Sequence, residues 1–378
     1  MSVENIRVMH INTARSWRGG ERQVFQLAEE LAGRGITQLV AGKRNSELGK
    51  RCQAAGIPFA GFGMHGEWDL LSARRMLQTA RRWNINILHA HTARAHSLAL
   101  YVAARRPEAR LLVSRRVDFP ARPNWLSRRK YMSPLVTRYI AISENVRRIL
   151  IADGISESKI DIAYSGIDLA PFERFPVNPQ QDDVARALRK QYGLESEVLI
   201  GGNVAALVPH KDQHTLLRAL GHLRNDMSGR VCILILGEGR LRAELMELAR
   251  SLDLLDSRMV IFAGFHANIY DYYRLFDFFI MSSKEEGLGT SVLDAMAAGL
   301  PVVATAGGGI PEMIDTEKGG LLVPVGDDYA LGTAIRRIAT DSRFRKSAAE
   351  YNRKRVRDFS KAATAEATLR IYNEVLPD

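Results

Sequence analysis

The sequence predicts an α/β protein made of two doubly wound, parallel-sheet domains. Three observations support this prediction. The chain has 378 residues, more than one ordinary domain needs. Short buried-strand patterns alternate with helical patterns along it, and the alternation restarts after a break rich in proline and polar residues. Because strands that alternate with helices form parallel sheets, each half predicts its own sheet with helices on both faces.

The first half contains five strand patterns, each short and mostly apolar. They lie at residues 6–11, 37–41, 85–89, 110–113 and 139–142. A helix is expected over 21–33, because Val24, Leu27 and Leu31 recur at helical spacing. The repeated order of strand and helix predicts a first Rossmann-like domain over residues 1–170.

The second half repeats the pattern after a break over 171–197, which carries three prolines and a polar run and reads as a linker with a short surface helix. Its strand patterns lie at residues 198–204, 231–236, 259–263, 278–281, 301–304 and 320–323. They predict a second Rossmann-like domain over 198–358. The remaining residues, 359–378, are expected to form a helix that returns to the first domain. Two such domains are expected to face a cleft, with ligands at the carboxyl ends of the strands.

The positive charge of the chain is concentrated in its first half. The net charge is +11 overall. Residues 1–176 carry 28 Lys and Arg against 15 Asp and Glu, a net of +13, whereas the remainder carries 25 against 27. A basic half indicates an anionic partner such as a phosphorylated substrate or an anionic membrane surface. A solvated, Arg-rich helix surface is the simpler alternative.

The sequence shows no secretory leader and no apolar run of the roughly 18 residues that a membrane-spanning helix needs. We therefore expect a cytoplasmic protein, with or without peripheral attachment to the inner face of the plasma membrane. No nucleic-acid-binding signature appears in the sequence, so nucleic acid is not an expected partner.

The densest group of chemistry-bearing residues follows the strand pattern 278–281. Glu286 is followed by Gly287, Leu288 and Gly289, and a helix is expected to start at about Thr290. Glycines let a ligand approach the backbone, and the free amides of a helix N-terminus attract phosphate. A carboxylate beside such a site accepts hydrogen bonds from sugar hydroxyls. A plain strand–loop–helix unit with solvated acids is the alternative.

This region resembles the retaining glycosyltransferases of family 4, which have the GT-B fold. Glu286 and Asp294 resemble the Glu-x7-Glu signature of that family, with Asp in the second place. The runs Ala-Met-Ala-Ala-Gly-Leu-Pro-Val-Val-Ala (295–304), Gly-Gly-Ile-Pro-Glu (308–312), Leu-Gly-Glu-Gly (236–239) and Arg-Gly-Gly-Glu-Arg (18–22) are similar to further motifs of the family. The resemblance covers nearly the whole chain and is strongest from Val198 to Pro324.

The resemblance implies a role for individual residues toward a nucleotide-sugar donor. Glu286 would hold hydroxyls of the sugar, Asp294 the ribose, and Lys211 the diphosphate. A lysine beside a departing diphosphate lowers the barrier by stabilising its charge. The other implied donor-binding residues are Gly19, Gly20, Gly237, Gly287, Leu288, Gly289 and Thr290. A UDP-sugar is the favoured donor, as a substrate, and no cofactor is expected.

The chain departs from the family pattern in two places. Ala206 stands where the family usually has an arginine near the diphosphate. The family also often has a histidine after the strand pattern 110–113, where this chain has Ser-Arg-Arg. Arg115 is therefore a candidate catalytic residue and Arg116 a candidate acceptor contact, with a solvated basic pair as the alternative.

The acceptor is expected on the basic first domain. A stretch of cations mixed with aromatic and apolar residues suits an anionic lipid or a phosphorylated glycan. Its candidate contacts are Arg116, Arg122, Arg128, Arg129 and Lys130, together with His91 at a strand end. His89, His91 and His96 invite a metal interpretation, but spacing places no third ligand and no Asp-x-Asp motif occurs, so no metal site is expected.

Together these features predict a metal-independent, retaining glycosyltransferase that transfers a hexose from a nucleotide-sugar to an acceptor hydroxyl. Lipopolysaccharide or another bacterial surface glycan is the expected product class, and a glycan or glycolipid the acceptor. One alternative is a GT-B protein with another activity, such as an epimerase. A non-enzymatic protein that binds sugar nucleotides, other anions or nucleic acid is a further alternative.

Overall fold

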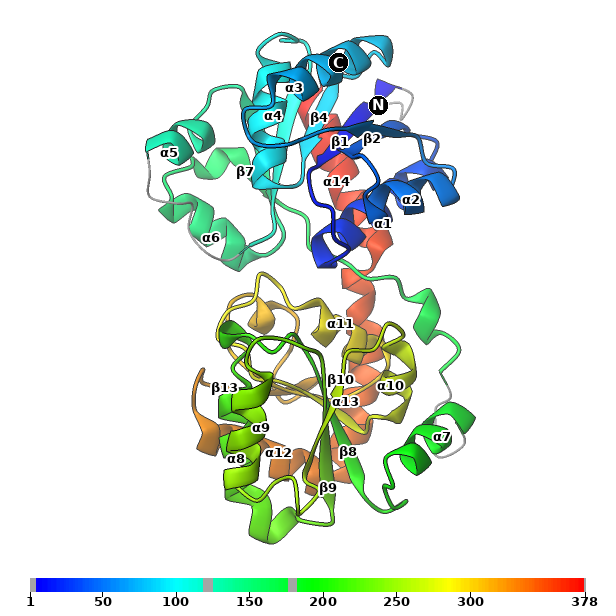
Figure 1. Ribbon diagram of the computed structural model, residues 1–378, viewed down its shortest axis with the longest axis vertical. Coiled ribbons are helices and arrows are strands. Elements are labelled where there is room, and N and C mark those ends of the chain that lie inside the picture. The colour runs from blue at the N-terminus through cyan, green and yellow to red at the C-terminus, as the bar shows by residue number, and fades with distance from the viewer. Residues whose placement is uncertain (1–4, 118–124, 176–181, 377–378) are drawn as a thin grey trace. The chain divides into compact units, whose positions relative to one another are not determined.

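The computed structural model describes residues 5–117, 125–175 and 182–376, which form two compact units. Unit 1 comprises residues 1–168 and 359–378, and unit 2 comprises residues 169–358. Each unit has its own parallel sheet with helices packed against it (Figure 1). The predicted fold class, two doubly wound parallel-sheet domains, is confirmed.

Unit 1 contains a seven-stranded sheet with the order β3-β2-β1-β4-β5-β6-β7. Its strands are β1 (Arg7–Asn12), β2 (Thr37–Lys43), β3 (Phe59–Phe62), β4 (Ile87–Ala90), β5 (Arg110–Arg115), β6 (Val136–Ala141) and β7 (Ile160–Ile162). Its helices are α1 (Gly19–Gly33), α2 (Glu47–Ala54), α3 (Leu70–Arg82), α4 (Ala93–Ala103), α5 (Trp125–Tyr131), α6 (Glu144–Ala152) and α14 (Lys361–Val375).

Unit 2 contains a six-stranded sheet with the order β10-β9-β8-β11-β12-β13. Its strands are β8 (Leu199–Val204), β9 (Val231–Leu236), β10 (Val260–Gly264), β11 (Phe278–Met281), β12 (Val302–Thr305) and β13 (Gly320–Val323). Its helices are α7 (Asp183–Gln191), α8 (Gln213–Met227), α9 (Arg242–Ser251), α10 (Tyr270–Leu275), α11 (Thr290–Ala297), α12 (Asp328–Thr340) and α13 (Ser342–Arg355).

The order of strands reverses direction once in each sheet. The reversal lies between β1 and β4 in unit 1 and between β8 and β11 in unit 2. The loops that leave two such strands run to opposite sides and leave room for a ligand at the carboxyl edge of the sheet. The residues that follow these four strands are therefore the candidates for a functional site.

The last helix, α14, packs on α1 within unit 1, although it follows the whole of unit 2 in the sequence. Its buried face includes Ile371, Tyr372 and Val375, which join the core formed by β1 and α1. Lys361 at its start forms ion pairs with Glu29 (2.7 Å) and Asp168 (3.4 Å). Unit 1 is therefore built from the first and the last parts of the described chain.

The stretch 171–197, expected to be a linker, belongs to unit 2 where it is described. Helix α7 lies in it and packs on α10. Asp182 caps α7 through the backbone amide of Val184 (2.8 Å) and forms an ion pair with Arg274 (3.3 Å). Polar composition predicted a spacer, but these contacts attach the segment to the unit that follows.

Candidate functional site

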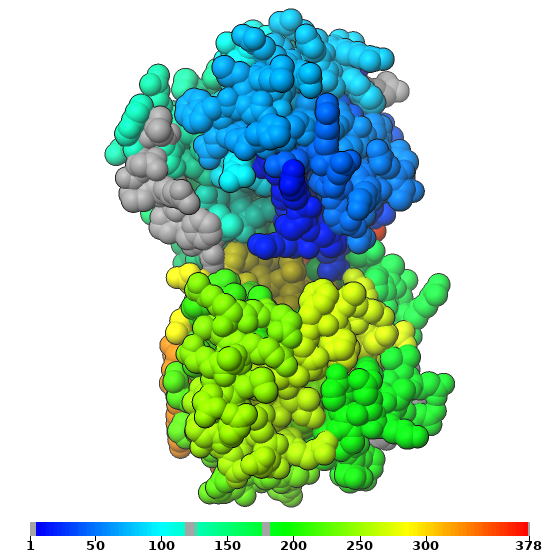
Figure 2. All heavy atoms as spheres, in the orientation of Figure 1, coloured from blue at the N-terminus to red at the C-terminus, as the bar shows by residue number. Residues whose placement is uncertain are grey.

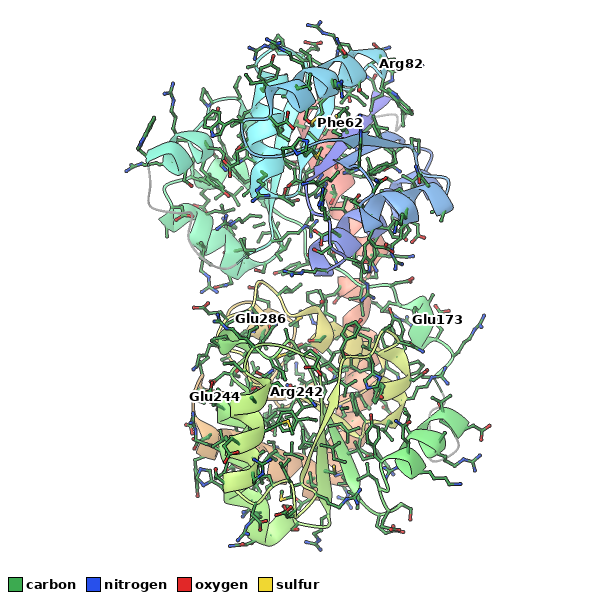
Figure 3. The ribbon with its side chains drawn as sticks, viewed as in Figure 1. Phe62, Arg82, Glu173, Arg242, Glu244 and Glu286 are labelled. Atoms are coloured by element: carbon green, nitrogen blue, oxygen red, sulfur yellow. The ribbon has the colours of Figure 1, made fainter. Side chains whose placement is uncertain are left out.

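In unit 2, the loops that follow β8 and β11 bring Lys211 and Glu286 together. The Nζ atom of Lys211 donates to Oε1 of Glu286, and both side chains are largely buried. Ser283 Oγ donates to the same carboxylate oxygen (2.9 Å). Glu286, labelled in Figure 3, lies in the loop between β11 and α11. The structure thus joins two residues that lie 75 positions apart at the switch point of the sheet.

The two loops are also fastened through their backbones. Lys284 N donates to the carbonyl of His210 (2.8 Å), and Ser282 Oγ donates to the carbonyl of Lys211 (3.0 Å). The side chain of Asn203, in β8, donates to the carbonyl of Ile280 in β11 (3.0 Å). These bonds fix the backbone beneath Lys211 and Glu286, so the pair is held by the sheet rather than by its own ion pair alone.

Glycines after β12 hold the Glu286 loop from its other side. Gly309 N donates to the carbonyl of Glu286 (2.8 Å), and a Cβ atom at Gly308 would lie 2.1 Å from that carbonyl oxygen. No side chain larger than hydrogen fits there. The Gly-Gly-Ile-Pro-Glu motif therefore sets the position of the Glu286 backbone.

Helix α11 begins directly beyond Glu286. Its N-cap residue, Gly289, has a φ of 97°, a left-handed conformation that glycine adopts without strain. The free amides at this helix start and the positive end of its dipole favour an anion beside Glu286. Asp294 lies within α11 and is buried, Thr290 is half-buried at the first position, and the side chain of Leu288 is buried in the core. The donor contacts assigned to these residues stay predictions.

The loop after β9 lies beside the loop after β8. Gly237 N donates to the carbonyl of Gly264, and a Cβ atom at Gly237 would lie 2.0 Å from the carbonyl oxygen of Ala205. Leu207 N donates to the carbonyl of Glu238 (3.1 Å). Ala206, where the family pattern has an arginine, is exposed between these contacts. The candidate site in unit 2 thus presents a carboxylate, a lysine and helix amides at one edge of the sheet.

In unit 1, Gly19 and Gly20 open α1 after the loop that follows β1. A Cβ atom at either glycine would meet nothing within 4 Å, so neither is required by the packing of the protein itself. Glu21 in the same turn accepts a hydrogen bond from Arg18 N (3.1 Å). The open space over both glycines suits the close approach of a ligand.

Three buried histidines lie at the switch point of the unit 1 sheet: His10 in β1, His89 in β4 and His91 directly after β4. His10 Nδ1 is 3.1 Å from His91 Nε2, so one ring donates and the other accepts. His89 contacts the hydroxyls of Tyr372 (2.6 Å) and Ser114 (2.7 Å) through its two nitrogens. Burial lowers the pKa of His10 to about 3 and those of His89 and His91 well below the ordinary value, so all three are neutral at pH 7.

This cluster corrects one inference from the sequence. Spacing placed no third ligand beside His89 and His91, but His10 provides one, and ligand atoms of the three rings lie within 4.8 Å of one another. The three rings lie together because β1 and β4 are neighbouring strands and His10 is in register with His89. Both nitrogens of His89 already contact hydroxyl groups, so the hydrogen-bonded network accounts for its position without an ion.

Arg115 and Arg116 have separate surroundings, as expected for consecutive residues at a strand end. The guanidinium of Arg115 is buried and donates to the Tyr131 hydroxyl (2.7 Å). Arg116 donates to Ser165 Oγ (3.0 Å), and its charge acts on the three histidines and on Glu21. Burial lowers the pKa of Arg116 to about 10, so it stays charged at neutral pH. Arg116, rather than Arg115, therefore belongs to the histidine cluster.

The other predicted acceptor contacts are divided by the structure. Arg122 lies outside the described residues. Arg128 and Arg129 are exposed on α5. Lys130 is mostly buried, forms an ion pair with Glu67 (3.4 Å) and donates to the carbonyl of Ala93 (3.1 Å). Lys130 thus holds α5 against α4 and against the loop before α3.

The sequence did not predict several residues of the candidate sites in unit 1 and in unit 2. Ser283 and Thr305 support the Glu286 loop, Thr305 by donating to the carbonyl of Ser283 (2.6 Å). Register between neighbouring strands could have predicted His10. Tyr372 lies 283 positions from its partner His89, and no local pattern signals such a contact.

Comparison with known proteins agrees with this architecture. The sequence profile described as glycosyl transferases group 1 matches residues 184–355, and that of glycosyltransferase family 4 matches residues 17–171. A D-inositol 3-phosphate glycosyltransferase from Kineococcus radiotolerans is 27% identical over 99% of this chain and 91% of its own length. A lipopolysaccharide core biosynthesis glycosyltransferase, LpsE of Rhizobium meliloti, is 32% identical over 45% of this chain and 48% of its own length.

Solved structures share the fold over the full length. HepE from Anabaena, crystallised with UDP, superposes with a TM-score of 0.84 and 20% identity, covering 98% of this chain and all of the other. At this identity the likeness concerns the fold alone. Among the described residues of the present chain, no helix combines the length and apolarity needed to cross a membrane.

Proposed function

The chain belongs to the GT-B glycosyltransferases of group 1 and family 4, and from this we propose a retaining enzyme that uses a nucleoside diphosphate sugar. The observation that carries the proposal is the buried carboxylate of Glu286, paired with Lys211 directly before the N-terminus of α11. A carboxylate can bind the hydroxyls of a sugar, and a lysine with free helix amides can bind the diphosphate attached to it. In this proposal Glu286 accepts hydrogen bonds from sugar hydroxyls.

The proposed reaction exchanges one bond at the anomeric carbon for another. The bond from that carbon to the diphosphate oxygen breaks, and the acceptor hydroxyl forms the new bond from the same face of the sugar. The hydroxyl proton passes to the departing diphosphate. Lys211 and the amides at the start of α11 stabilise the charge that grows on the leaving oxygen, which lowers the barrier.

We further propose UDP as the carrier of the sugar and a bacterial surface glycan such as lipopolysaccharide as the product class. The first proposal draws on the UDP bound by the Anabaena structure, and the second on the name of the Rhizobium relative. In unit 1, Arg116 and His91 are proposed to face the acceptor, because His91 directly follows β4 at the switch point of the sheet and Arg116 interacts with Glu21 beside Gly20.

Binding of UDP tests the proposed donor class. At about a hundred times its dissociation constant UDP should stabilise the folded protein by about 2.7 kcal/mol, which corresponds to a rise of about 5–10 °C in melting temperature. Uridine should have a much smaller effect, because it lacks the diphosphate. Slow release of sugar from the donor without acceptor would then distinguish an enzyme from a binding protein. Equal shifts with uridine and UDP would contradict the assignment of Lys211 and α11 to the diphosphate.

Turnover is expected to survive EDTA unchanged, because the proposed charge stabilisation comes from Lys211 and helix amides. The assay measures sugar transfer before and after about a tenfold excess of EDTA over any divalent ion. The histidine cluster provides a matched test, since His10→Gln should leave the response to EDTA unchanged. A loss of activity that Mn²⁺ or Mg²⁺ restores would overturn the metal-independent mechanism.

A further inference from the structure

Three large apolar side chains are exposed around the start of α3. Trp68 is 77% exposed, Leu70 53% and Leu71 62%. The helix start between them is well formed, because Asp69 accepts hydrogen bonds from Ser72 N (2.9 Å) and from His65 N (3.1 Å). The backbone is therefore fixed in a conformation that presents these side chains to the surroundings.

The outer face of α3 continues from these residues as a basic surface. The buried face carries Ala73, Met76, Leu77 and Ala80, and the helix packs on α4 and β3. The exposed face carries Arg74, Arg75, Arg81 and Arg82, and none of these forms an ion pair within the part of the chain that is described. Figure 3 shows Arg82 at the outside of unit 1. We call Trp68, Leu70, Leu71 and these four arginines the α3 surface.

The charge of this region is unusual in the sequence as well. Between Asp69 and Glu108 the chain contains seven arginines and no acidic residue. In Figure 2 the azure atoms at the top of unit 1 come from this part of the chain and lie open to solvent. A surface helix normally mixes both signs of charge, so an excess of unpaired arginine indicates an anionic partner.

The start of α3, with Trp68, Leu70 and Leu71, lies at the carboxyl edge of the unit 1 sheet, and the helix then runs back toward the opposite edge. Trp68 belongs to the loop that leaves the carboxyl end of β3, and all strands of this sheet are parallel. The loop is tied to α4 by Glu67, which accepts from Ser97 Oγ (3.1 Å) and pairs with Lys130 of α5. The exposed side chains of Trp125, Arg128 and Arg129 on α5 are thereby linked to the α3 surface.

We propose that the α3 surface binds an anionic lipid membrane. Trp and Leu side chains at the helix start enter the interface between headgroups and acyl chains, and the arginines contact lipid phosphates. A nucleic acid would account for the arginines and the tryptophan but gives no role to two adjacent exposed leucines. The proposal deepens the proposed function in one respect: a membrane bound at this edge would present a lipid-linked acceptor to the loops after β1 and β4.

The test measures partition of the full-length protein onto vesicles of phosphatidylcholine with about a quarter phosphatidylglycerol. Each arginine near such a surface contributes about fivefold in affinity, so Arg74→Glu with Arg75→Glu should lower the partition coefficient by about 30-fold or more. Trp68→Ser with Leu71→Ser should lower it by at least tenfold. Raising the salt concentration should weaken wild-type binding.

Matched controls come from exposed residues of unit 2. Arg343→Glu with Lys346→Glu on α13 makes the same change in net charge, and Tyr329→Ser removes an aromatic that is 72% exposed on α12. Both controls should bind vesicles like the wild type. All variants should bind UDP like the wild type. The two proposals can therefore fail separately, because a wild type that does not bind UDP would contradict the donor assignment and leave the membrane proposal standing.

Wild-type protein that does not bind the anionic vesicles, or α3 variants that bind as well as the wild type, would overturn the proposal. A third outcome would also overturn it: a wild type that is a dimer without lipid, and that Trp68→Ser with Leu71→Ser converts to a monomer while vesicle binding stays unchanged. A loss of vesicle binding confined to the α3 variants would establish it.

Discussion

Replacement of Glu286 by Gln is expected to reduce the turnover number about 30- to 900-fold. The carboxylate is proposed to hold sugar hydroxyls most tightly in the transition state, and loss of one such contact costs about 2–4 kcal/mol. The amide keeps the size of the side chain and a hydrogen-bond acceptor for Ser283. The measurement is steady-state sugar transfer, with thermal unfolding to show that the variant is folded.

The neighbouring residue provides a matched control for this experiment. Glu285 is exposed and is the residue directly before Glu286, so Glu285→Gln makes the same chemical change one position away. It should retain nearly full turnover. Turnover near that of the wild type in Glu286→Gln would remove Glu286 from the proposed mechanism.

The second large expected effect is the acid sensitivity of unit 1. Burial lowers the pKa of His10 and of His96 to about 3 from the ordinary value of 6.5, and Lys130 adds to the effect at His96. Because the folded-state pKa is the lower one, the unfolded chain binds more protons below pH 6.5, and stability is lost as the pH falls from about 6.5 toward 3. Each of these two groups should cost about 2 kcal/mol at about pH 5. His89 and His91 shift in the same direction.

The distribution of tryptophan allows unit 1 to be followed separately. All four tryptophans, Trp17, Trp68, Trp83 and Trp125, lie in unit 1. Tryptophan fluorescence during urea unfolding should therefore show a large fall in the stability of unit 1 between about pH 8 and pH 5. None of the histidines of unit 2 is buried, so that unit should change less.

A variant of His96 tests whether its buried imidazole causes the loss of stability at low pH. Both ring nitrogens of His96 are buried without a hydrogen-bond partner among the described residues, and the ring packs edge-on against Tyr131 and Tyr139. His96→Phe should keep the packing and reduce the loss of stability at about pH 5 by about 2 kcal/mol. A loss as large as that of the wild type would show that the imidazole of His96 does not cause it.

Apolar patterns predicted the buried elements well and the partly buried edge strands poorly. All six strands of unit 2 lie at or within one residue of the predicted bounds, and α14 lies inside the predicted range 359–378. The strands β3 and β7 were missed because they lie at the edges of their sheet and are only partly buried. Gly61 and Asp161 interrupt their apolar residues, so neither strand forms a continuous apolar run.

The candidate site was predictable where its residues follow strands and unpredictable where it depends on packing. Glu286, Lys211 and the glycines sit in loops next to recognisable strands, so local patterns indicated them. The contact of Tyr372 with His89 depends on where the last helix packs, and the burial of Lys130 depends on Glu67 in another loop. No local signal reports either arrangement.

The position of α14 also dictates the order in which the two units can fold during synthesis. Unit 2 is continuous in sequence, so it can fold as soon as residue 358 has left the ribosome. Unit 1 precedes unit 2 in the sequence but lacks a helix that covers its core and supplies Tyr372 to His89, and this helix is made only after unit 2. The nascent seven-stranded sheet must therefore wait, with apolar surface exposed to chaperones, until residues 361–375 are translated.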